Sequence, residues 1–200
     1  MASINPSIAI LNTWQGRVEI ALRGGCAVLC FIGMICAAVT LEAIKEIKDR
    51  GTYEDSDKYE AAAGWLVFVS VMGMVYEPLV ALLRFLNLEI LNQPLFLMIF
   101  SCVDAGISIV FAISFFSGGV ASAVYSSDNA DTYDDVGCTS SIDACNDLAR
   151  VRNSEGASAA FSFFAMIAFA ALAGIVILTI VLKNRGNATD PSDYKEDTTQ

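Results

Sequence analysis

Four long apolar stretches dominate the hydropathy pattern of this 200-residue chain. They cover residues 18–43, 61–86, 94–125 and 157–182, and polar segments separate them. A helix that rises about 1.5 Å per residue needs about 20 apolar residues to cross a hydrocarbon core of about 30 Å, and each stretch exceeds that length. The pattern therefore predicts an all-α protein, a bundle of four transmembrane helices.

The polar segments outside these stretches predict the domain organisation. We expect residues 1–16 to form an N-terminal segment, residues 17–185 the four-span domain, and residues 186–200 an acidic tail. The tail has too little apolar content to fold alone, so we expect it to be disordered. The first apolar stretch is a full span rather than a short cleavable signal, and we expect it to act as the targeting signal.

Composition narrows the classes of function. Apolar residues make up 55% of the chain and charged residues 17%, which does not suit a soluble surface. The net charge of −10 and the lack of a basic cluster exclude nucleic acid as a partner. Histidine is absent, and no nucleophile, base and orienting group converge in the sequence. The chain is therefore predicted to be no enzyme and to hold no cofactor and no metal.

Two cysteines determine the predicted orientation. Four spans place both termini on one side of the membrane, but basic residues are divided six against six between the two sides. Cys138 and Cys145 lie in the polar segment between the third and fourth stretches, and a disulfide there requires an oxidising compartment. We predict that this segment is lumenal or extracellular and that both termini are cytosolic. The alternative is two free thiols in a cytosolic loop.

The two outer polar segments are acidic. Residues 46–60 contain six acids and three bases, and residues 126–156 contain seven acids and two bases. Solvation of exposed loops explains this charge, and binding of Ca²⁺ or of a basic partner is the alternative. The spacing does not match an EF-hand loop, because the alternating ligands and the closing Glu are missing.

Three ionisable residues lie deep within the apolar stretches. Counted from the cytosolic end of each span, Arg23 lies about 8 Å deep, Glu77 about 13 Å and Asp104 about 15 Å, at 1.5 Å per residue. One plane can hold all three, and a charge inside a membrane needs a partner. We predict an ion pair between Arg23 and one of the carboxylates that fixes helix register. The alternative is a proton or ion relay.

Local residue types predict how the helices bend and pack. Pro78 follows Glu77 and predicts a kink, because proline lacks an N–H and frees a carbonyl in the preceding turn.

Pairs of small residues four positions apart predict close approach of helices, and we expect these contacts within one bundle. The pairs are Gly33 and Ala37, Ser108 and Ala112, and Ala170 and Gly174.

The chain resembles the MARVEL-domain superfamily, which includes physins and gyrins, MAL-type proteolipids, occludin-type and fungal eisosome proteins. The resemblance covers about residues 14–185 and depends on three short segments besides the four spans. These are Ala21-Leu22-Arg23-Gly24-Gly25, Cys102-Val103-Asp104-Ala105-Gly106 and Phe115-Phe116-Ser117-Gly118-Gly119. The first outer loop is shorter than in physins. Claudins match less well, because their first outer loop contains a Trp and a Cys pair and the first outer loop of this chain has neither.

The resemblance implies a multi-pass membrane protein that organises membrane domains or vesicle traffic. It implies membrane lipids as partners, in cholesterol-rich membranes, and lateral contact with further copies or other membrane proteins. The expected location is the plasma membrane or secretory and endocytic vesicles. Two alternatives stay open: a component of cell junctions or adhesion, and a subunit of an oligomeric channel or transporter that uses Glu77 and Asp104.

Overall fold

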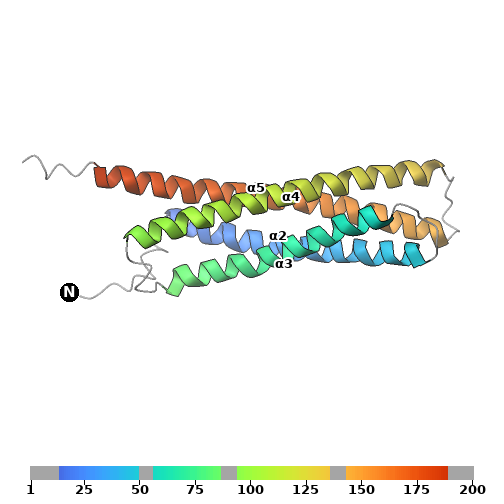
Figure 1. The fold of residues 1–200 in the computed structure, drawn as a ribbon, viewed down its shortest axis with the longest axis horizontal. Helices are drawn as coiled ribbons and strands as arrows, with labels where there is room; N and C mark the ends of the chain where they lie inside the picture. The colour runs from blue at the N-terminus through green and yellow to red at the C-terminus, as the bar shows by residue number, and fades with distance from the viewer. Residues whose placement is uncertain (1–13, 50–55, 87–93, 136–142, 189–200) are drawn as a thin grey trace, which may run out of the picture.

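The computed structural model describes residues 14–49, 56–86, 94–135 and 143–188, and all of them lie in four long helices (Figure 1). Each helix contains an apolar segment long enough to cross a membrane. The predicted all-α, four-span bundle is therefore confirmed. The helices are α2 (Trp14–Asp49), α3 (Ser56–Leu86), α4 (Pro94–Asp135) and α5 (Asp143–Ala188).

The helices are longer than the apolar stretches that predicted them. α4 continues to Asp135 and α5 begins at Asp143, so most of residues 126–156, which we expected to form a loop, is helical. Hydropathy marks the part of a helix that suits lipid, whereas the polar turns continue because the two helices pack together. The Ser126 hydroxyl, for example, donates a hydrogen bond of 3.1 Å to the Arg152 carbonyl oxygen.

Successive helices run antiparallel, and their packing is uneven (Figure 1). α4 packs along α5, and α2 packs along both α3 and α5, while α3 and α4 contact each other much less extensively. We call the end with the start of α2 and the end of α3 the terminal end, and the opposite end the loop end. Direct contact between α3 and α4 is therefore limited, and α4 reaches the rest of the bundle mainly through α5.

The middle of the bundle is filled by aromatic side chains. Phe169 is fully buried, and its ring centroid lies 5.0 Å from that of Phe111 and 5.7 Å from that of Phe115. Leu66 and Leu172 are buried in the same cluster of apolar side chains. Such a closely packed interior stabilises the bundle and separates its two ends.

The outer surface between the ends carries large apolar side chains. Phe31 and Val75 are 49% and 58% exposed, and Ile113 and Ile167 are 63% and 58% exposed. One such side chain comes from each helix, so apolar groups surround the bundle. This is the surface expected of a protein whose solvent is lipid.

The small-residue pairs do not all face the same way. Gly33, Ala37, Ser108 and Ala112 are buried, and a Cβ built on Gly33 would lie 3.5 Å from the Ser70 hydroxyl oxygen. Their expected contacts within one bundle therefore agree with the structure. Ala170 and Gly174 are exposed, and a Cβ on Gly174 would meet nothing within 4 Å. For this pair the expectation was wrong, because α5 is apolar on all sides and its sequence does not reveal which face is inward.

We predict that Gly73→Ala destabilises the bundle, whereas Gly64→Ala on the same helix does not. A Cβ on Gly73 would lie 2.7 Å from the Cys30 Sγ and 3.4 Å from Phe169 Cζ, while a Cβ on Gly64 would meet nothing within 4 Å. Overpacking costs about 1–3 kcal/mol, against up to about 1 kcal/mol gained in helix propensity. Thermal unfolding in micelles measures both variants. Equal midpoints for the two would contradict the packing described for α2 and α3.

Candidate functional site: an intramembrane ion-pair cluster

Arg23 is buried at the terminal end of the bundle, where its guanidinium meets three carboxylates. Its Nη1 donates to Glu77 Oε2 at 2.8 Å and to Asp104 Oδ1 at 3.4 Å. Its Nη2 donates to Asp104 Oδ2 and to Glu19 Oε1, the latter at 2.9 Å. The Nε of Arg23 donates to the same Glu19 oxygen at 3.1 Å. All five N–H donors of the side chain are thereby used. The structure brings together the three residues that the sequence singled out.

Asp104 is the acceptor that joins the other helices. Besides the two bonds from Arg23, it accepts one from the Tyr76 hydroxyl at 3.0 Å and one from Arg84 Nη2 at 2.9 Å. Its side chain is 1% exposed. Because α3 and α4 pack little against each other, these bonds are a principal connection between them. The aspartate therefore fixes the register of α4 against α2 and α3.

Glu19 and Arg84 complete the cluster, and sequence reasoning missed both. Arg84 Nη1 lies 2.7 Å from Glu19 Oε1, so the second guanidinium bridges the carboxylates of Glu19 and Asp104. Both residues lie close to a span end, where charges are usually assigned to the interface. Two signals could have found them: Glu19 precedes Arg23 by one helical turn, and Arg84 is long enough to reach inward. We refer to Glu19, Arg23, Glu77, Arg84 and Asp104, with Tyr76, as the ion-pair cluster.

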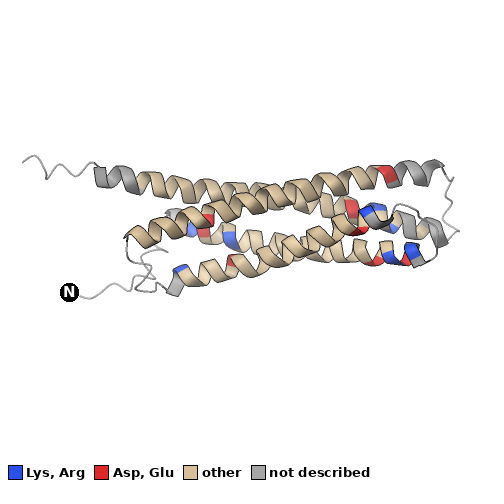
Figure 2. Cartoon of the chain, viewed as in Figure 1, with Lys and Arg blue, Asp and Glu red and all other residues tan. Residues whose placement is uncertain are grey.

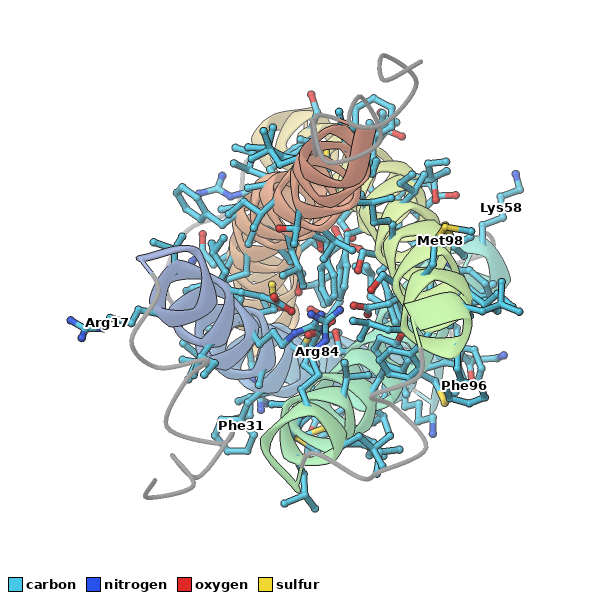
Figure 3. The ribbon with its side chains drawn as sticks, turned by 90° about the vertical axis from the view of Figure 1, so that its left-hand side faces the viewer. Arg17, Phe31, Lys58, Arg84, Phe96 and Met98 are labelled. Carbon is cyan, nitrogen blue, oxygen red and sulfur yellow. The ribbon has the colours of Figure 1, made fainter. Side chains whose placement is uncertain are left out.

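Figures 2 and 3 show where the charged residues lie along the bundle and how some labelled side chains point. In Figure 2 the charged positions gather toward the two ends of the bundle, and the long middle of the described helices carries neither blue nor red. Figure 3 looks onto the terminal end and shows Arg84 pointing between the helices, whereas Phe31 and Phe96 point outward. α5 contributes no charge to the cluster, because its sequence has no ionisable residue from 156 to 182.

Among the carboxyl groups of the ion-pair cluster, that of Glu77 accepts the fewest hydrogen bonds. Its side chain is fully buried, its Oε2 accepts from Arg23, and its Oε1 has no hydrogen-bond partner in the described part of the chain. Pro78 follows on the exposed side of α3, which continues as one helix to Leu86. The bend expected at Pro78 stays a prediction.

The loop end of the bundle is held differently. The rings of Tyr59 and Tyr125 lie 4.4 Å apart beside a small buried cluster. The ion pairs that the structure records there, Arg150 with Glu42 and Glu46 and Lys48 with Glu60, are exposed, and such pairs contribute little to stability. The buried ion pairs recorded among the described residues, those of Arg23 with Glu77 and Asp104, lie at the terminal end.

The other candidate residues are only partly described. Cys138 lies outside the described residues, and so does the side chain of Cys145, so their disulfide stays a prediction. Cys26 and Cys30 are fully buried on the inner side of α2. Within the described helices, no group of three or more His, Cys, Asp or Glu side chains is placed to hold a metal ion.

Four apolar helices with an internally paired charge cluster define a multi-pass integral membrane protein. The chain belongs to the MARVEL family, described as a membrane-associating domain, whose model matches residues 17–175. This match confirms the resemblance found in the sequence. No curated protein matches the chain. No solved structure matches it either.

We predict that Asp104→Leu lowers the yield of folded protein and its thermal stability. The change removes four hydrogen bonds and leaves donors on buried Arg23 and on partly buried Arg84 and Tyr76 without this acceptor, at about 1–3 kcal/mol for a buried group left unsatisfied. Val103→Leu is the matched control, because Val103 is the neighbouring residue and is 54% exposed. Size-exclusion profiles in detergent measure both variants. A wild-type profile for Asp104→Leu would show that the cluster is not needed for folding.

Proposed function

We propose that this protein organises lateral membrane domains or the membranes of trafficking vesicles and that it catalyses no reaction. The observation that carries the proposal is the direction of its side chains. The charged groups of the ion-pair cluster pair with one another inside the bundle, and the outside carries large apolar side chains on all four helices. The surface offered within the membrane is thus suited to lipid and to other membrane helices.

The proposal includes the partners and the location. Membrane lipids, including those of cholesterol-rich membranes, contact the apolar surface, and lateral contacts join further copies or other membrane proteins. The location is the plasma membrane or secretory and endocytic vesicles, with both termini in the cytosol. Membership of a family of membrane-associating domains supports the general role.

The alternatives have less support. A channel that uses Glu77 and Asp104 needs a polar path through the bundle, but Phe111, Phe115 and Phe169 pack together in its middle. Any pore would then have to lie between subunits. A junction component needs an outer surface large enough for adhesion, yet α2 and α3 are separated by only the six residues 50–55.

The location of the protein in cells tests the proposal. We expect a C-terminally tagged copy to form plasma-membrane patches or small cytoplasmic vesicles. Antibody should reach the tag after selective permeabilisation of the plasma membrane, and a lumenal marker should stay unstained as the control. Enrichment confined to cell–cell contacts would favour adhesion, and a tag stained on intact cells would contradict the topology.

A separate experiment tests the predicted outer disulfide. Cys138→Ser and Cys145→Ser should each abolish the mobility change that reducing agent produces in the wild-type protein, because either one removes the bond. Cys102→Ser is the control, since Cys102 is a free thiol on the exposed side of α4. Labelling of Cys138 by a maleimide confined to the cytosol would show that the segment faces the opposite side.

A further inference from the structure

The charges of the ion-pair cluster do not balance. It contains three carboxyl groups, on Glu19, Glu77 and Asp104, and two guanidinium groups, on Arg23 and Arg84. If all five were ionised, the cluster would carry a net charge of −1 in a largely buried place, where the Glu77 side chain is 0% exposed and only Glu19 and Arg84 keep 12% and 22% exposure. An uncompensated charge in such a site is very unfavourable, so a group usually becomes neutral instead.

The contacts indicate which carboxyl group is the surplus one. Glu19 and Asp104 each contact both guanidinium groups, so these four side chains form a closed set of two positive and two negative charges. Glu77 contacts only Arg23, through one oxygen atom. Its other oxygen is buried and has no partner among the described residues.

Among the described residues, Arg23 is the cation recorded in contact with Glu77. The ionisable groups that face Glu77 from α2 are Glu19 and Arg23, with the thiols of Cys26 and Cys30 on the same inner side of the helix. α3 supplies Tyr76 and Arg84, and α4 supplies Asp104. The membrane-spanning part of α5 has no ionisable residue.

We propose that the ion-pair cluster is a proton-binding site and that Glu77 holds the proton, on the oxygen that has no hydrogen-bond partner among the described residues. One proton from solvent forms an O–H bond at the carboxylate, and no other bond changes. A neutral Glu77 still accepts the hydrogen bond from Arg23, and the cluster becomes electrically neutral. Loss of the proton leaves the cluster with an unmatched negative charge, close to the carboxylates of Glu19 and Asp104. This inference does not depend on the proposed function.

Infrared spectroscopy of the full-length protein tests the proposal directly. A protonated carboxyl group has a carbonyl stretch separate from that of a carboxylate, and a detergent without ester groups leaves this region clear. At neutral pH we expect one such band in the wild-type protein, a shift of the band in D₂O after exchange, and its loss in Glu77→Gln. Glu155→Gln is the control, because Glu155 is also buried but lies toward the loop end.

The pH dependence of unfolding gives a second measurement. If folded Glu77 keeps a proton that the unfolded chain releases above about pH 5, the folded state binds more protons and stability falls as the pH rises. The folding equilibrium constant of the wild-type protein should then fall by up to about tenfold per pH unit relative to Glu77→Gln. The fall ends once the folded protein has also released the proton. Gln mimics the neutral carboxyl group, so the variant should fold and lack this contribution.

Three results would overturn the proposal. The first is a spectrum without a protonated carboxyl band in folded wild-type protein, and the second is a band that disappears in Glu155→Gln but not in Glu77→Gln. The third is the same pH dependence in wild type and Glu77→Gln. If the band is absent and sodium chloride raises the unfolding midpoint more than choline chloride does, a metal cation rather than a proton neutralises the cluster.

Discussion

The relative positions of α2, α3 and α4 depend on the guanidinium group of Arg23. It is buried among carboxylates from α2, α3 and α4, and it uses every donor that it has. Removal of one partner from such a set leaves a charge that neither water nor lipid can solvate. The three helices are therefore held at one relative height, and the weak apolar contact between α3 and α4 is sufficient.

The interior of the bundle specifies how the helices are arranged, and the exterior contacts the lipid. Inside, electrostatic contacts at the terminal end and aromatic packing in the middle specify a single arrangement of helices. Outside, the apolar side chains gain nothing from burial against protein, because lipid is equally apolar. The exterior is thus free to vary in shape and in the lipids it contacts without a loss of fold. A membrane-associating domain is well served by such a division.

The sequence predicted the four spans, one plane for Arg23, Glu77 and Asp104, and an ion pair between Arg23 and one of the two carboxylates, because length and depth follow directly from helix rise. It missed Glu19 and Arg84, whose positions near the span ends suggest interfacial groups although their side chains turn inward. The sequence also did not predict which face of an all-apolar helix points inward. Ala170 and Gly174 were expected to pack inside the bundle, but both are exposed. The polar helical turns beyond the membrane depend on contacts between α4 and α5, which hydropathy does not record.

The pair of Glu19 and Arg23 has a consequence for biosynthesis. Asp104 follows Arg23 by 81 residues, so at about 5–20 residues per second the first helix is made several seconds before this partner exists. Glu77 follows Arg23 by 54 residues and is also late. Glu19, one turn away on the same helix, is already in place when Arg23 leaves the ribosome. In the folded bundle Glu19 still accepts two of the five hydrogen bonds from Arg23, so the first partner that the chain offers to this arginine is kept when the later helices add theirs.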